Sequence, residues 1–139
     1  MKKILVLFLI FIFSANVGFC AVNSYDKYGR KSGSYRETAS GINSYDKYGR
    51  KSGSYREKSN GTVIKYDKYG RKSGEYRKTS NGYNSYDKYG RKTGSYKENS
   101  NGTVIKYDKY GRKEGSFKKG LNGKITEYDK YGRQIGTYR

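Results

Sequence analysis

The step Gly-Arg-Lys recurs along the chain and provides its most distinctive chemistry. Its arginines are Arg30, Arg50, Arg71, Arg91, Arg112 and Arg133, and the lysines that follow five of them are Lys31, Lys51, Lys72, Lys92 and Lys113. A guanidinium can form two parallel hydrogen bonds with phosphate or carboxylate oxygens, so a regular row of arginines suits an anionic ligand. Tyrosines at a second recurring position offer ring faces that can stack on sugars or bases; they are Tyr35, Tyr55, Tyr76 and Tyr96. We predict that these residues bind an anionic polymer or glycan.

The same repetition argues against an enzyme. A catalytic site needs an acid, a base or a nucleophile at a unique position. Here every polar residue of note is copied from repeat to repeat, and the chain contains no histidine. The recurring aspartates supply one carboxylate per repeat, whereas calcium takes about six to eight oxygen ligands. The sequence therefore predicts no catalytic residue, no metal site and no cofactor.

The first 20 residues differ in composition from the rest. A basic start over 1–3 precedes an uninterrupted apolar run over 4–13, and a small, polar stretch ends at Cys20. These are the three parts of a secretory signal, and the run is too short for a transmembrane helix, which needs about 20 apolar residues. We predict a signal peptide over 1–20, no permanent transmembrane helix, and a protein that is secreted or retained in the cell envelope. The alternative is a lipoprotein modified at Cys20, although Phe19 stands where such signals have a small residue.

The mature chain expected after cleavage is basic, aromatic and poor in aliphatic residues. It retains 29 of the 31 lysines and arginines and all 12 acidic residues, which gives a net charge of +17. All 18 tyrosines lie in it, and the only cysteine is Cys20, so a disulfide framework is excluded. Low aliphatic content with high charge is typical of disorder, but tyrosine rings can bury enough area to form a core. This composition fits either a chain that is ordered by itself or one that becomes ordered when it binds a ligand.

A tandem repeat covers residues 21–139. The string YDKYGR occurs six times, at intervals of 20 or 21 residues, and begins at Tyr25, Tyr45, Tyr66, Tyr86, Tyr107 and Tyr128. In this string, aspartate can accept hydrogen bonds at the start of a type I turn and glycine can adopt a positive φ, as in a short bulged hairpin. A second turn signal, Asn-Gly, closes four of the repeats. We predict an all-β fold in which each repeat is one β-hairpin and six hairpins form one extended, twisted antiparallel meander.

A bulged first turn also predicts a register for the third hairpin. It pairs Tyr66 with Lys72, Ile64 with Gly74, and Thr62 with Tyr76. An apolar residue three positions before each leading tyrosine, such as Val63, does not fit this pattern, so either a second bulge redirects it or both faces are partly covered. Equivalent arginines of successive hairpins should lie about 10 Å apart, in a line that suits a linear polyanion. The last repeat stops at Arg139, which in this scheme leaves an unpaired edge.

The repeat unit, Asn-Gly followed by Tyr-Asp-x-x-Gly-Arg and a return strand, resembles the YD repeat of bacterial Rhs and wall-associated proteins and of animal teneurins. The resemblance spans essentially the whole mature chain and implies β-sheets that wind into shells outside the cytoplasm, with a link to carbohydrate binding. One departure is a lysine, such as Lys31, where that family has an apolar residue after Gly-Arg. A second resemblance, carried by segments such as Gly33-Ser34-Tyr35, is to MORN-like hairpin repeats.

The sequence is compatible with two kinds of partner. The first is a surface polyanion or anionic polysaccharide bound by the rows of arginine, lysine and tyrosine. The second is a protein, including another copy of the chain, joined through the sheet edge in a structural or adhesive role. A signal peptide argues against an intracellular nucleic acid.

Overall fold

The computed structural model describes residues 21–139, and the predicted signal peptide over 1–20 lies outside this range. The described chain is all β-structure and contains no helix long and apolar enough to cross a membrane. Its strands are β1 (Val22–Asp26), β2 (Lys31–Thr38), β3 (Gly41–Asp46), β4 (Lys51–Glu57), β5 (Val63–Asp67), β6 (Lys72–Thr79), β7 (Gly82–Asp87), β8 (Lys92–Glu98), β9 (Val104–Asp108), β10 (Lys113–Lys119), β11 (Ile125–Asp129) and β12 (Gln134–Tyr138). The predicted hairpins are therefore present, with two strands in each repeat.

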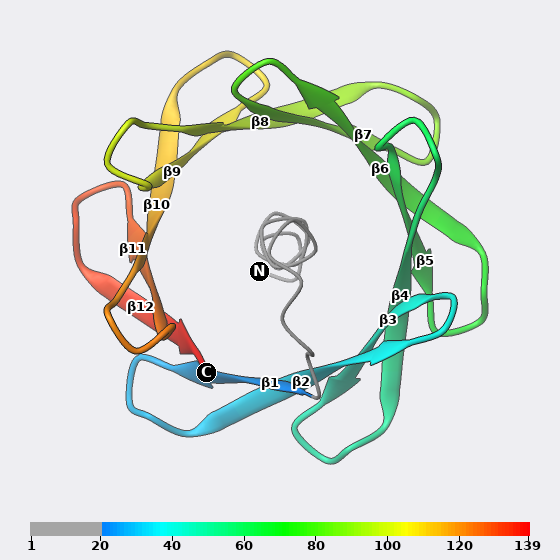
Figure 1. Ribbon diagram of the computed structural model, residues 1–139, viewed down its shortest axis with the longest axis horizontal. Coiled ribbons are helices and arrows are strands. Elements are labelled where there is room, and N and C mark those ends of the chain that lie inside the picture. The colour runs from blue at the N-terminus through cyan, green and yellow to red at the C-terminus, as the bar shows by residue number, and fades with distance from the viewer. Residues whose placement is uncertain (1–20) are drawn as a thin grey trace.

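The twelve strands form a closed antiparallel barrel (Figure 1). Each strand pairs with its neighbours in the chain, and β1 pairs with β12. The predicted open meander is therefore wrong, and so is its unpaired last edge. We call the junction of β1 with β12 the seam. There Tyr25 lies opposite Thr137, just as Tyr45 lies opposite Ser34 at the junction of the first and second repeats. Because the seam uses the register of an ordinary junction, the common twist of the hairpins brings the last strand back to the first.

The YDKYGR string forms the bulged turn that its residues predict. In the third repeat the Gly70 amide donates to the Asp67 carbonyl at 3.1 Å, and the Asp67 amide donates to the Arg71 carbonyl at 2.9 Å. Gly70 has a φ of +80°, in the left-handed region that glycine adopts without a steric penalty. The same main-chain hydrogen bonds recur in all six copies.

A bulge near this turn decides which side chains face the barrel axis. Tyr66 pairs with Lys72, as predicted, but the register then shifts, and Val63 rather than Thr62 lies opposite Tyr76. The predicted pairs of Ile64 with Gly74 and of Thr62 with Tyr76 are therefore one residue off. A β-bulge inserts one extra residue into one strand and so reverses the facing of the residues beyond it. The bulge therefore redirects Val63, which faces inward with Tyr76. The neighbouring pair Ile64 and Glu75, on the other face, is also buried, so both faces are partly covered as well.

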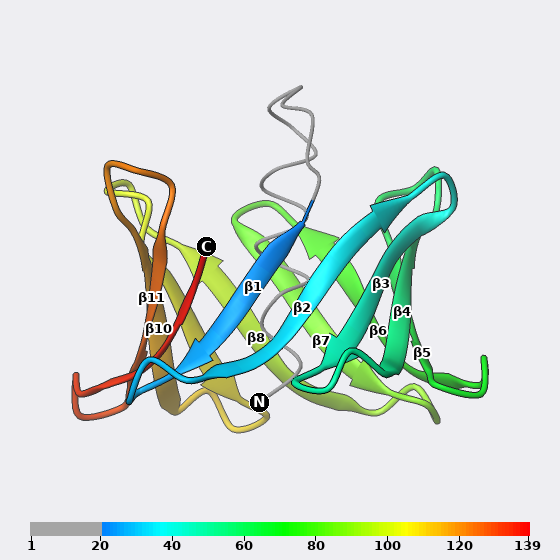
Figure 2. The ribbon, with the colours of Figure 1, turned by 90° about the horizontal axis from the view of Figure 1, so that it is seen from below.

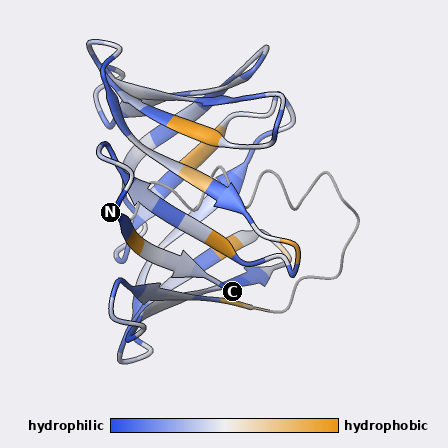
Figure 3. Ribbon diagram, turned by 90° about the vertical axis from the view of Figure 1, so that its left-hand side faces the viewer, coloured by the Kyte–Doolittle hydropathy of each residue, from blue (hydrophilic) through white to orange (hydrophobic). Residues whose placement is uncertain are grey.

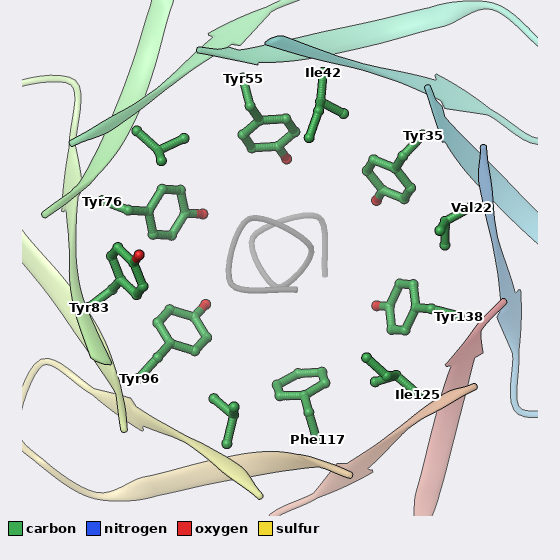
Figure 4. Close-up of a cluster of buried hydrophobic side chains, with 12 residues drawn as sticks. Val22, Tyr35, Ile42, Tyr55, Tyr76, Tyr83, Tyr96, Phe117, Ile125 and Tyr138 are labelled. Carbon is green, nitrogen blue, oxygen red and sulfur yellow. The ribbon is translucent and has the colours of Figure 1, made fainter. Parts of the chain in front are cut away.

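One large apolar side chain from each strand faces the barrel interior, and together we call them the inner ring. Its members are Val22, Tyr35, Ile42, Tyr55, Val63, Tyr76, Tyr83, Tyr96, Val104, Phe117, Ile125 and Tyr138, all buried. They surround the barrel axis, with an aromatic residue on every even-numbered strand (Figure 4). Hydrophobic residues are accordingly concentrated in short stretches of the strands (Figure 3). Half of the inner ring of this aliphatic-poor chain is thus tyrosine.

The outer face carries a second set of tyrosines, each beneath a cation from the adjacent hairpin, and we call these pairs the outer belt. They are Arg36 with Tyr45, Arg56 with Tyr66, Arg77 with Tyr86, Lys97 with Tyr107, Lys118 with Tyr128, and Arg139 with Tyr25. The cations lie 4.2 to 5.6 Å from the ring centroids, within the range of a cation–π interaction. The last pair crosses the seam, so the same contact joins every hairpin to the next.

Candidate anion-binding rim

All six YDKYGR turns lie at one end of the barrel, the lower end in Figure 2, and we call them the rim. They gather there because every odd-numbered strand runs toward this end and every even-numbered strand leaves it. The rim comprises residues 26–30, 46–50, 67–71, 87–91, 108–112 and 129–133. The Asn-Gly turns lie at the opposite end.

Each rim turn presents an exposed tyrosine beside two cations. In the third repeat the side chain of Tyr69 is 70% exposed. The Lys68 Nζ lies 4.9 Å from the centroid of the Tyr69 ring, and the Arg71 guanidinium carbon lies 5.1 Å from it. Such cation–π contacts at an exposed site keep the cations close to the aromatic face. An aromatic surface and two positive charges are therefore presented together.

The aspartate of the turn positions the arginine. Asp67 Oδ1 accepts hydrogen bonds from the main-chain amides of Tyr69 and Arg71, at 2.8 and 3.0 Å. Asp67 Oδ2 accepts the Arg71 Nε at 2.9 Å, while the arginine side chain remains 73% exposed. Because this contact uses Nε, it directs the outer part of the guanidinium toward solvent. The hydrogen bond from the Arg71 amide lowers the pKa of Asp67 below its ordinary value of 3.8, so this carboxylate is ionised at neutral pH.

The six turns have nearly the same geometry. The distances between arginine Nε and aspartate Oδ2 range only from 2.7 to 2.9 Å. The exposures of the six turn tyrosines range only from 69 to 71%. With the lysine that follows each of the first five turns, the rim carries 17 basic residues against six aspartates, a net charge of +11. The molecule thus repeats one cationic and aromatic unit around a closed ring.

The predicted site residues fall into two places. Arg30, Arg50, Arg71, Arg91, Arg112 and Arg133 lie in the rim, and Lys31, Lys51, Lys72, Lys92 and Lys113 are the exposed first residues of the strands that leave it. The arginines form a ring and not the predicted line, because the sheet closes. In contrast, Tyr35, Tyr55, Tyr76 and Tyr96 are only 1 to 7% exposed and belong to the inner ring. The prediction that their faces are exposed is wrong, because the bulge turns them inward.

Sequence reasoning missed the exposed tyrosines and their lysines. The tyrosines are Tyr28, Tyr48, Tyr69, Tyr89, Tyr110 and Tyr131, and the lysines directly before them are Lys27, Lys47, Lys68, Lys88, Lys109 and Lys130. The signal was present, since both residues occupy the two central positions of a type I turn, where side chains point away from the sheet. These tyrosines replace the inner-ring tyrosines in the candidate site.

No group of histidine, cysteine, aspartate or glutamate residues within 21–139 is arranged to hold a metal ion. No protein-family model matches the chain, and no curated protein sequence is significantly similar to it. The candidate site therefore rests on its own geometry.

Proposed function

We propose that the protein is a non-enzymatic, secreted or cell-surface repeat protein whose rim binds an anionic polymer or glycan. The observation that carries this proposal is the sixfold repetition of one exposed Lys-Tyr-x-Arg unit around the rim. Repetition of a single binding unit suits a ligand that is itself repetitive.

The chemistry of each unit matches an acidic sugar. Arginine and lysine bind carboxylate, sulfate or phosphate oxygens. A tyrosine ring exposed beside them can pack against the face of a sugar ring. Since the units are linked in one rigid barrel, binding at one unit raises the effective concentration of the polymer at the next. Weak contacts at single units can therefore add up to useful affinity.

The edge-mediated alternative is not supported by the fold. Strand addition requires an unpaired edge, and the described barrel joins β1 to β12. A net charge of +11 on the rim also opposes the contact of one rim with another.

Binding of the mature chain, residues 21–139, to dextran sulfate, polyphosphate and uncharged dextran tests the proposal. We expect both polyanions to bind and uncharged dextran to bind far more weakly. Affinity for the polyanions should fall steeply as the salt concentration rises, because binding releases the cations condensed on the polymer.

Two variants distinguish binding at the rim from binding caused by the overall positive charge of the protein. The first replaces the six rim arginines with glutamine, and we expect it to lose about tenfold or more in affinity and to show a shallower salt dependence. The control replaces Lys58, Lys78, Lys119 and Lys124, near the opposite end, with glutamine and should change both much less for each charge removed. Unchanged affinity and salt dependence in the rim variant would exclude the rim as the site.

A further inference from the structure

We propose that one barrel cross-links two separate chains of its polyanionic ligand, each chain occupying a different arc of the rim. This inference rests on the proposed function and adds an activity to it. It follows from the closure of the sheet, because a ring of binding units has a geometry that an open row of the same units lacks.

The curvature of the rim limits how many units a straight polymer can contact. Neighbouring turns are separated by two strands, so they lie about 10 Å apart or somewhat more in a tilted barrel. Six units at that spacing around a ring place opposite turns roughly 20 Å apart. A polymer that follows two or three neighbouring turns leaves the ring where the ring curves away. The turns on the opposite arc then remain free.

Each arc retains enough charge to bind by itself. The first three turns, with the lysines that follow them, carry nine basic residues and three aspartates, a net charge of +6. The other three carry eight basic residues and three aspartates, a net charge of +5. A polyanion that neutralises one arc therefore leaves a positive arc across the barrel mouth. That second arc can attract a second chain.

The two chains would lie at the same end of the barrel. All six exposed tyrosines of the described chain are in the rim, and the only large hydrophobic residue exposed elsewhere within 21–139 is Leu121, in a turn at the opposite end. The aromatic part of the recognition unit is thus confined to one end. Cross-linking would hold two polymer chains side by side beneath a single barrel.

Two variants with identical losses of charge can test this arrangement. The contiguous variant replaces Lys27, Arg30, Lys47, Arg50, Lys68 and Arg71 with glutamine and so removes three neighbouring turns. The alternating variant replaces Lys27, Arg30, Lys68, Arg71, Lys109 and Arg112 with glutamine and so removes every second turn. Both keep the main-chain hydrogen bonds to the turn aspartates, which do not depend on these side chains. Circular dichroism checks that both remain folded.

Binding and bridging are measured separately with dextran sulfate. Binding is measured on immobilised dextran sulfate, and bridging is measured as energy transfer between donor-labelled and acceptor-labelled dextran sulfate mixed with the protein. We expect the unmodified chain to bind and to bridge. The contiguous variant should bind within about fivefold of it, through the intact arc, but should not bridge. The alternating variant, with no two neighbouring turns intact, should lose about a hundredfold in affinity, because multivalent gain is lost.

The outcomes distinguish this inference from the proposed function. If the unmodified chain binds dextran sulfate but produces no energy transfer, or if the contiguous variant bridges as well as the unmodified chain, the cross-linking inference is wrong and the binding function stands. If the unmodified chain does not bind any polyanion, both are wrong.

Discussion

A single aspartate determines both the shape of each turn and the direction of its arginine. In the third repeat, Asp67 Oδ1 accepts two main-chain amides, which fixes the turn, and Oδ2 accepts the Arg71 Nε, which orients the guanidinium. Lysine in place of Arg71 could not reproduce this contact, because an ammonium has no second set of donors in a fixed plane. The structural and the proposed binding roles of the turn therefore depend on the same residue.

The turn aspartates should make the stability of the barrel fall in acid. The pKa of Asp67 lies below 3.8, chiefly because the Arg71 amide donates to its ionised form. A carboxylate with a lowered folded-state pKa stabilises the fold above its unfolded-state pKa, and this stabilisation is lost as the pH falls through the folded-state value. We expect the Tm, followed by circular dichroism, to be steady from neutral pH to about pH 4 and to fall below it.

The control for this pH dependence replaces all six turn aspartates with asparagine. Asparagine keeps an Oδ1 acceptor but has no charge to lose, so the variant should be less stable at neutral pH and should lose less further stability in acid. If the asparagine variant loses stability in acid as steeply as the unmodified chain, other groups cause the acid transition. The next candidate is then Glu75, because a hydrogen bond from Lys72 is the chief cause of its lowered pKa.

Two glycines of the third repeat should respond differently to alanine. Gly70 has a φ of +80°, but the space that a Cβ would enter is open, so Gly70→Ala should cost only the strain of a left-handed residue, about 1 to 2 kcal/mol. At Gly74 a Cβ would lie 2.7 Å from the Tyr86 carbonyl oxygen, so the main chain of β7 would have to move. We expect Gly74→Ala to cost more, about 3 kcal/mol, in urea denaturation. The reverse order would contradict the close approach of β6 and β7.

At the scale of the strands, turn chemistry was the most predictable feature. Aspartate and glycine in YDKYGR specify the bulged turn, and the pair Tyr66 with Lys72 next to it is correct. The register beyond that pair was not decided by the sequence. The position of Val63 was compatible with a second bulge or with cover on both faces, and only the bulge brings Val63 opposite Tyr76. The bulge also accounts for the error in the predicted site. The tyrosines of the even-numbered strands lie beyond it and are buried in the inner ring, so their ring faces are not available to a ligand as predicted.

The outer belt predicts which substitutions a strand junction tolerates. Arg36 lies 5.0 Å from the Tyr45 ring centroid, and in two later repeats Lys97 and Lys118 occupy the equivalent place. Arg36→Lys should therefore leave the free energy of unfolding nearly unchanged. Arg36→Gln should lower it by about 0.5 to 1 kcal/mol, the usual contribution of an exposed cation–π pair. Urea denaturation distinguishes the two, and equal losses would show that the charge is not what stabilises the junction.

At the scale of the whole molecule, closure could not be inferred from any one repeat. A single hairpin specifies its turns and its pairing with the next hairpin, but whether a sheet closes depends on the twist summed over all its strands. The register of the seam, where Tyr25 meets Thr137, repeats that of Tyr45 with Ser34. Closure therefore requires no contact that is unique to the junction of β1 with β12. It requires only that the number of repeats matches the curvature that each repeat adds to the sheet.

An engineered disulfide across the seam tests closure directly. Asn23 and Arg139 exchange two main-chain hydrogen bonds, of 2.7 and 2.9 Å, and such a pair has a Cα separation of about 5.5 Å, within the range of a disulfide. Residues 21–139 contain no cysteine, so Asn23→Cys with Arg139→Cys introduces the only two thiols. We expect an intramolecular disulfide on mild oxidation of a dilute sample, seen as loss of both free thiols in a monomer.

The matched control pairs Asn23→Cys with Lys97→Cys. Lys97 is the equivalent of Arg139 in the fourth repeat, but it lies on β8, which is not a neighbour of β1. The control variant should therefore keep both thiols. An open sheet would leave the thiols of both variants free or join them only between molecules, and the ring of binding units would then be a row.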